Sequence, residues 1–348
     1  MPLLSREQKR ASIAIPKCSS ILDIKQNYNE PAKILCGEKW ITSACLKCAG
    51  QKCIQYADED ISCMNFPEFS YERDLNVCPV GAISWDYSKE MPRIDNEKCF
   101  GCGLCASRCP IGAIYRKNNQ MKISEPDLNY DIIPINQPNF AEHKRVIRGL
   151  EELAWNHHFQ RENDEIFEQI YNRVAQFDGR SMASNVLIRN LIIALGCNCA
   201  ISRTGDVYTR MDAVYSNPYC KGAVEIELGR DTLEASRGIL DDIAVLHSRS
   251  GLDKNDNVAL VVCLSFPNKR QGYFQVIKDI HNVLNMQIQT ISLGALLLLV
   301  WNGVYACFDK KLFYVDFDNM SIRNIMEQRL FREVNISYGK LGILEPEK

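Results

Sequence analysis

The chain has 348 residues, which suggests about two domains at roughly 150 residues each. It carries 41 Lys and Arg against 43 Asp and Glu, so the net charge of -2 gives no sign of a basic nucleic-acid-binding tail. No apolar run approaches the roughly 20 residues of a membrane-spanning helix, and the polar first 16 residues lack the apolar core of a signal peptide. The composition therefore predicts a globular, cytoplasmic protein without a membrane span.

Cysteine is the unusual component, because 11 of the 16 cysteines lie between Cys18 and Cys109. Disulfides are rare in the expected reducing compartment, so clustered cysteines favour metal binding. The densest group has the spacing C-x2-C-x2-C-x3-C-P and consists of Cys99, Cys102, Cys105 and Cys109. Glycines at 101 and 103 would let the backbone approach an iron–sulfur cluster closely. Zinc is the alternative, but zinc sites usually pair two separate cysteine knuckles.

The end of this motif also occurs earlier in the chain. Residues 78–83, Cys-Pro-Val-Gly-Ala-Ile, match residues 109–114 at five of six positions, and Cys45, Cys48 and Cys53 precede the first copy. This tandem arrangement over about residues 36–116 resembles the bacterial dicluster ferredoxins. The resemblance implies an α+β ferredoxin-like domain that holds two 4Fe–4S clusters.

In that family each half of the repeat lends its fourth cysteine to the cluster of the other half. The resemblance therefore implies one cluster on Cys99, Cys102, Cys105 and Cys78, and a second on Cys45, Cys48, Cys53 and Cys109. The first half departs from the family because 24 residues separate Cys53 from Cys78, and Cys63 inside this stretch is an alternative third ligand. Cys18 and Cys36 have no partner at ligand spacing, and we expect them to be small buried side chains.

The second half of the sequence predicts an α/β domain. Its apolar patterns follow the order α-β-β-α-β-α-β-α, which indicates a mixed sheet flanked by helices. The predicted divisions are residues 1–35 (N-terminal extension), 36–117 (ferredoxin-like domain), 118–140 (linker), 141–180 (helical connector), 181–302 (α/β domain) and 303–348 (C-terminal extension).

One predicted strand of this domain carries two carboxylates. Side chains alternate along residues 224–228, so Glu225 and Glu227 share a face, and Asp212 lies at the end of the preceding predicted strand. Carboxylates placed in this way suit a hard divalent cation, which can activate water and polarise a phosphodiester. Ordinary charges on the solvent side of a half-exposed strand would give the same alternation.

The element order and these residues resemble the PD-(D/E)xK nuclease superfamily, whose members have the restriction-endonuclease-like fold. The resemblance implies that Asp212, Glu225 and the backbone carbonyl of Ile226 bind Mg²⁺ or Mn²⁺, and that Asp212, Glu225 and Glu227 form the catalytic set. Glu227 stands where the family usually has lysine, although a minority of active restriction endonucleases have glutamate there. DNA is the partner that this resemblance implies.

Three functions remain open on the sequence alone. We expect a metal-dependent DNA endonuclease with an iron–sulfur module, acting in restriction, defence or repair. The alternatives are a dicluster ferredoxin that passes electrons to a redox partner, and a nuclease-fold binding protein without activity. The absence of a GxGxxG or GxxxxGK loop argues against a nucleotide-binding oxidoreductase domain. A homodimer is a further candidate assembly.

Overall fold

The computed structural model describes residues 12–348 except 28, 49, 65, 67–68, 135–139, 155–161, 178–181, 207–208, 230–231, 254–256, 307 and 309–311. The chain divides into two compact units, and both are built from separate stretches of sequence. Unit 1 comprises Met1–Tyr56, Asn76–Arg161 and Trp301–Gly303, and unit 2 comprises Ala57–Leu75, Glu162–Val300 and Val304–Lys348. Within the described part of the chain, every helix is too short or too polar to cross a membrane.

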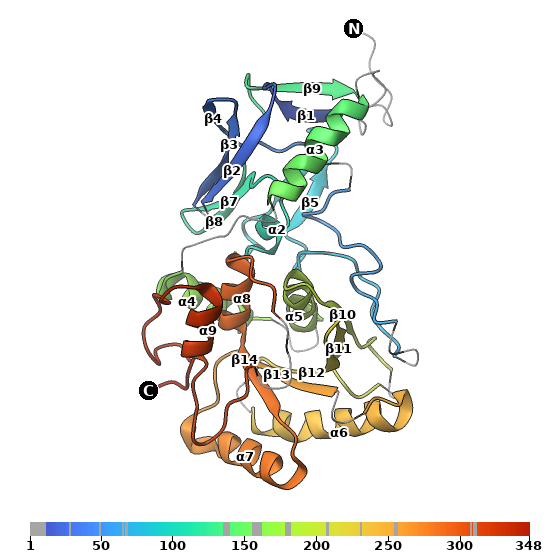
Figure 1. The fold of residues 1–348 in the computed structure, drawn as a ribbon, viewed down its shortest axis with the longest axis vertical. Helices are drawn as coiled ribbons and strands as arrows, with labels where there is room; N and C mark the ends of the chain where they lie inside the picture. Colours follow the sequence, from blue (N-terminus) through green and yellow to red (C-terminus); the bar gives the residue numbers. More distant parts are fainter. Residues whose placement is uncertain are drawn as a thin grey trace. The chain divides into compact units, whose positions relative to one another are not determined.

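Unit 1 consists mainly of antiparallel strands (Figure 1). Its strands are β1 (Ser12–Pro16), β2 (Ile21–Asn27), β3 (Glu30–Cys36), β4 (Lys39–Thr42), β5 (Ile83–Asp86), β6 (Met91–Ile94), β7 (Ile114–Lys117), β8 (Gln120–Ile123) and β9 (Tyr130–Pro134). Strands β2, β3 and β4 form one sheet, whereas β1–β9, β5–β6 and β7–β8 form separate pairs. The helices are α2 (Leu104–Ser107) and α3 (Phe140–Ala154).

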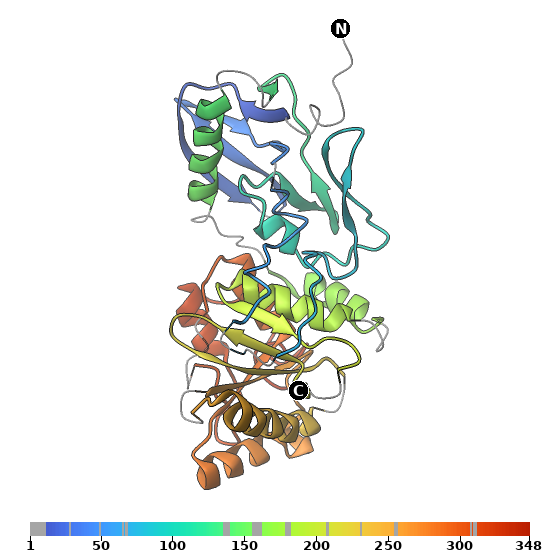
Figure 2. The same ribbon diagram turned by 90° about the vertical axis from the view of Figure 1, so that its right-hand side faces the viewer.

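The core of unit 1 lies between the three-stranded sheet and α3, which runs along it (Figure 2). Ile24 and Ile34 from the sheet are buried in one apolar cluster with Leu150 of α3. Residues 120–123 and 130–134, which the sequence predicted to be linker, are instead strands of this unit. Prolines suggested a break there, but both strands are short. Strand β8 pairs with β7, which directly precedes it, and β9 pairs with the distant β1.

The expectation that Cys18 and Cys36 are small unbonded side chains is wrong. The structure joins them in a disulfide, with their Cα atoms 5.3 Å apart. The cause is the pairing of β2 with β3, in which Ile21 lies opposite Cys36 and thereby brings the residues just before β2 alongside it. Spacing along the sequence cannot show this, because the contact depends on where the strand register begins.

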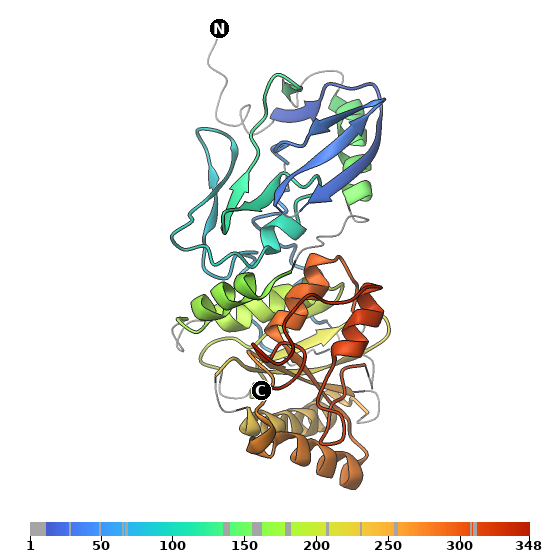
Figure 3. The same ribbon diagram turned by 90° about the vertical axis from the view of Figure 1, so that its left-hand side faces the viewer.

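Unit 2 is a five-stranded mixed sheet with helices on both faces (Figures 1 and 3). Its strands, in spatial order, are β10 (Asn198–Ile201), β11 (Ala213–Ser216), β12 (Lys221–Glu227), β13 (Asn257–Cys263) and β14 (Ile288–Ser292). The first three are antiparallel, and the last three are parallel. Its helices are α4 (Asp164–Val174), α5 (Ala183–Ala194), α6 (Leu233–Ser250), α7 (Tyr273–Leu284), α8 (Leu293–Trp301, whose last residue belongs to unit 1) and α9 (Arg323–Leu330), with a 3-10 turn at Lys269–Gln271.

The local sequence explains most of this order. Strand β13 is a continuous apolar run, which is typical of a parallel strand covered on both faces. Helices α6 and α7 supply the crossovers that parallel strands require. Strand β10 was missed because Asn198–Ile201 is short and lacks alternation. The strand that the sequence predicts to end near Asp212 instead begins just after it, at Ala213.

Strand β10 is an edge strand, and the segment Ala57–Leu75 lies along it. The backbone N–H of Cys199 donates to the Asp60 carbonyl at 3.1 Å, and that of Glu72 donates to the Ile201 carbonyl at 2.9 Å. A bridge between Tyr71 and Ser202 continues the pairing. The stretch between Cys53 and Cys78 therefore protects a sheet edge of unit 2.

Candidate functional site

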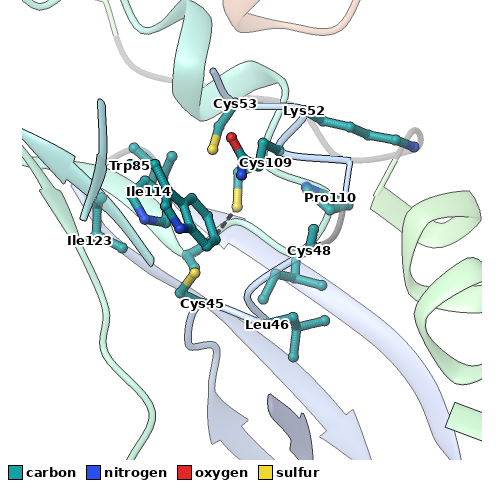
Figure 4. A pocket seen from close by; sticks show the side chains of 14 residues that line it. Cys45, Leu46, Cys48, Lys52, Cys53, Trp85, Cys109, Pro110, Ile114 and Ile123 are labelled. Atoms are coloured by element: carbon teal, nitrogen blue, oxygen red, sulfur yellow. Dashed lines mark hydrogen bonds between the residues drawn. The ribbon is translucent and has the colours of Figure 1, made fainter. Parts of the chain in front are cut away.

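Two cavities in unit 1 are lined by cysteines. Cavity I is lined by Cys45, Cys48, Cys53 and Cys109, together with apolar side chains that include Leu46, Trp85, Pro110, Ile114 and Ile123 (Figure 4). Cavity II is lined by Cys78, Cys99, Cys102 and Cys105, again among apolar side chains. Each cavity thus combines three cysteines from one half of the repeat with a single cysteine from the other half.

The two Cys-Pro turns have the same local geometry. In the first turn the backbone N–H of Ala82 donates to Sγ of Cys78 at 3.1 Å, and in the second that of Ala113 donates to Sγ of Cys109 at 3.2 Å. The glycine of each turn has a positive φ, 62° in the first and 64° in the second. Since N–H donors stabilise a thiolate, the repeated residues form a repeated sulfur-binding turn.

The three-cysteine motif of cavity II wraps around the start of a short helix. Gly101 and Gly103 have φ values of 76° and 81°, a backbone conformation that side-chain-bearing residues rarely adopt. Gly103 directly precedes α2, which carries Cys105. The glycines identified in the sequence are therefore needed for the turns that bring these sulfurs to one cavity.

Burial changes the acidity of the cavity thiols. It raises the pKa of the Cys45 thiol to about 12, although the N–H of Lys47, 3.4 Å from the sulfur, acts in the opposite direction. Burial also raises the pKa of the thiols of Cys53, Cys102, Cys105 and Cys109. These five thiols are therefore protonated at neutral pH in the metal-free protein, and binding iron as thiolates would release their protons. Buried sulfur ligands with backbone donors in apolar surroundings fit an iron–sulfur cluster.

Cys63, the alternative third ligand, lies elsewhere. It belongs to unit 2, where its thiol is buried and donates to the Val214 carbonyl of β11 with a sulfur–oxygen distance of 3.5 Å. Cys53 is the member of this pair that lines cavity I. The placement follows from the pairing of segment Ala57–Leu75 with β10, which carries Cys63 to the sheet of unit 2.

Unit 2 brings carboxylates together near the junction of β11, β12 and α6. Asp212 accepts a hydrogen bond through Oδ2 from the backbone N–H of Ile226 at 2.9 Å. Glu225 lies beside Asp242 of α6, and the two carboxyl groups share a hydrogen bond when one of them is protonated. Glu227 accepts a hydrogen bond from the N–H of Gly229 at 2.7 Å. Among the described residues, no three His, Cys, Asp or Glu side chains are placed to hold a single metal ion as they stand.

Asp242 is a member of this cluster that the sequence reasoning missed. It is only 2% exposed, and its Oδ2 atom is buried without a hydrogen-bond partner. The sequence does contain a signal, because Asp242 lies on the buried face of α6 between Ile239 and Leu246. A carboxylate on the apolar face of an amphipathic helix needs a polar partner, and Glu225 supplies it.

The crowded carboxyls hold protons more tightly than usual. Burial, then the nearby Asp212 and Asp242, raises the pKa of Glu225 to about 8, and burial raises that of Asp242 to about 7. Burial also raises the pKa of Asp212. A glycine at 238 makes room for this arrangement, because a Cβ there would lie 2.8 Å from Oε1 of Glu225.

These shifts predict that metal-free protein loses stability as the pH rises. Between about pH 4, the ordinary carboxyl value, and about pH 8, these carboxyls bind more protons in the folded state than in the unfolded state. The free energy of unfolding therefore falls across this window. We expect the thermal midpoint of chelator-treated protein to decrease from pH 5 to pH 8.5, and Glu225→Gln to flatten that decrease. Equal slopes in the two proteins would contradict the assignment.

Comparison with known proteins places residues 75–113 in the 4Fe-4S dicluster domain family. An uncharacterized ferredoxin of Methanocaldococcus jannaschii is 54% identical over 43 residues, which are 12% of this chain and 26% of that protein. The uncharacterized ferredoxin-like protein YdhY of Escherichia coli is 42% identical over 36 residues, 10% of this chain and 17% of that protein. The beta subunit of a dissimilatory-type sulfite reductase of Archaeoglobus fulgidus is 25% identical over 116 residues, 24% of this chain and 32% of that subunit. No solved structure matches the chain.

The matches cover a limited part of each protein, since the chain spans about a quarter or less of the two ferredoxin relatives. They establish that this chain contains a ferredoxin-type 4Fe-4S dicluster domain and is an iron–sulfur protein. The matched family region includes the motif from Cys99 to Cys109 and both Cys-Pro turns, but not Cys45, Cys48 or Cys53.

Proposed function

We propose that unit 1 holds two 4Fe–4S clusters and passes electrons between them and a redox partner. Cavity I would bind one through Cys45, Cys48, Cys53 and Cys109, and cavity II the other through Cys78, Cys99, Cys102 and Cys105. The observation that carries the proposal is the exchange of Cys109 and Cys78 between the two cavities. A cluster bound in this way accepts or donates one electron at a time.

The two cavities are close neighbours, which favours electron exchange over a purely structural role. Arg108, which lies between Cys105 and Cys109 in the sequence, donates through Nε to the Lys52 carbonyl beside Cys53 at 2.7 Å. The two sets of ligands therefore share one interior.

Iron content tests the proposal directly. Anaerobically purified protein should contain about eight irons per chain, four for each cluster. The measurement is iron and labile sulfide per chain, together with the paramagnetic resonance spectrum after dithionite reduction. An iron content near four would leave one cavity without a cluster, and stoichiometric zinc would exclude both.

A second candidate function concerns unit 2, which we propose to be a divalent-cation-dependent nuclease. The supporting observations are the strand order, three antiparallel strands followed by parallel ones after a helix, and the convergence of Asp212, Glu225 and Asp242. The buried, unpartnered Oδ2 of Asp242 and the raised pKa of Glu225 both describe carboxylates that a Mg²⁺ or Mn²⁺ ion would stabilise.

In this proposal the bound cation would activate water and polarise a DNA phosphodiester. Asp212 and Glu225 would hold the cation as carboxylates, with Asp242 beside Glu225. Glu227 cannot supply the positive charge of a lysine, so it would orient the attacking water or bind a second cation. A unit that binds DNA without cleaving it is the outcome expected if the cation is not bound.

A further inference from the structure

Cavity II has a buried cation at its wall. The Arg116 side chain at the end of β7 is 4% exposed, and its Nη2 donates a hydrogen bond to the Gly101 carbonyl in the cysteine loop. A Cβ on residue 101 would lie 2.9 Å from Nη2, so glycine is what allows the guanidinium to come so near.

A second donor holds the next carbonyl of the same loop. The indole Nε1 of Trp301, a residue of unit 1, donates to the Cys102 carbonyl at 2.6 Å. The Arg116 guanidinium lies over the Trp301 ring, 5.7 Å from its centroid, and Trp301 is 1% exposed. Arg116 and Trp301 together fix the positive charge against the loop, where little water can screen it.

The repeat shows what is special about this position. Arg116 follows Cys109 by seven residues, and Trp85 follows Cys78 by the same seven. Trp85 lines cavity I, whereas Arg116 lies against the loop of cavity II. Equivalent positions of the two repeats therefore present a neutral ring to cavity I and a cation to cavity II.

The lysines near cavity I do not restore the balance. Lys47 pairs with Glu90, with 3.9 Å between Nζ and Oε2, so its charge is partly neutralised. The Lys52 side chain runs away from the cavity sulfurs (Figure 4). The guanidinium of Arg108 donates to the Lys52 carbonyl of the cavity I loop at 2.7 Å, but Arg108 is only half-buried, so water screens its charge more than that of the buried Arg116.

We propose that Arg116 sets the order of the two reduction potentials, making the cluster in cavity II the easier one to reduce. The inference rests on the proposed function, because it requires both clusters. Reduction adds one negative charge to a cluster, and a fixed cation stabilises that charge. One electron from a one-electron donor such as dithionite enters cavity II first. An electron that first reduces the cavity I cluster passes on to the cavity II cluster. The cavity I cluster is thereby oxidised again, and no bond is made or broken.

The test is a potentiometric titration of anaerobic holoprotein followed by paramagnetic resonance. Arg116→Gln should lower the midpoint potential of the cavity II cluster by about 59 mV or more. For one electron this corresponds to a tenfold change in the ratio of oxidised to reduced cluster at a given potential. Arg116→Lys, which keeps the charge, should shift it less, and the midpoint of the cavity I cluster should not move. Arg93→Gln is the matched control, because it removes the same charge from an exposed position on β6.

Two results would overturn the inference. One is an unchanged cavity II midpoint in Arg116→Gln protein that retains its full iron content. The other comes from Cys78→Ala, which should remove the cavity II cluster and leave only the signal with the lower midpoint potential. If the signal with the higher midpoint potential survives instead, the proposed order is reversed. A wild-type iron content near four would instead refute the two-cluster proposal, so the two failures are distinguishable.

Discussion

Replacing Cys109 by alanine should remove the cluster bound by Cys45, Cys48 and Cys53, and should spare the cluster bound by the three cysteines next to it in the sequence. Cys109 lines cavity I although it ends the motif of cavity II. Cys78→Ala should have the converse effect on cavity II. Each variant should retain about four of about eight irons, and unit 1 should become less stable because cluster binding contributes to its folding.

Double variants identify which cluster is lost. Cys109→Ala combined with Cys45→Ala should lose no more iron than Cys109→Ala alone, whereas Cys109→Ala combined with Cys78→Ala should lose nearly all of it. Cys63→Ala is the matched control, since Cys63 is a buried cysteine of unit 2 outside both cavities. Loss of iron from the Cys63 variant, or additive loss in the first pair, would contradict the exchange of ligands.

Asp212→Asn and Glu225→Gln should abolish metal-dependent cleavage of DNA if unit 2 is a nuclease. Both changes keep the shape of the side chain but remove the charge that would bind the cation. We expect the rate with Mg²⁺ or Mn²⁺ to fall by about 10²-fold or more, as when a group that activates water is lost. DNA binding should persist or strengthen, because removing a carboxylate lowers its repulsion of phosphate.

Cleavage of plasmid DNA should be measured with anaerobic protein. Cation binding should be measured separately by calorimetric titration. Glu234→Gln is a suitable control, because Glu234 is an exposed carboxylate at the start of α6 that pairs with Arg237 at 2.6 Å. Asp242→Asn should weaken cation binding without abolishing it, since Asp242 lies beside Glu225, which would hold the cation. A wild-type protein that neither binds the cations nor cleaves any nucleic acid would end the nuclease proposal and leave electron transfer as the function.

The ferredoxin-type 4Fe-4S domain could be predicted from the sequence because its cysteine motif lies in local spacing. Three cysteines two residues apart, separated by glycines, force one set of turns, and two copies of Cys-Pro-x-Gly-Ala-Ile give two alike turns. Mixed α/β content in the second half followed from the apolar periods in the same way.

Contacts between distant segments could not be predicted from the local spacing of residues. The disulfide between Cys18 and Cys36 depends on strand register, and the place of Asp242 depends on which face of α6 meets Glu225. The pairing of Ala57–Leu75 with β10 joins residues more than a hundred positions apart, so no short motif encodes it. Arg116 in particular reads as an ordinary surface strand residue until Trp301 and Gly101 are seen around it.

The interleaving of the two units has a consequence for dissecting the protein into fragments. A fragment that ends before residue 162 contains all eight cavity cysteines, but it leaves Ala57–Leu75 without β10 and lacks the Trp301 donor of the cavity II loop. A fragment that begins there lacks the segment covering its own sheet edge. On the ribosome, unit 1 cannot complete its contacts until residues 301–303 have emerged, so most of both units must be synthesised before either is finished.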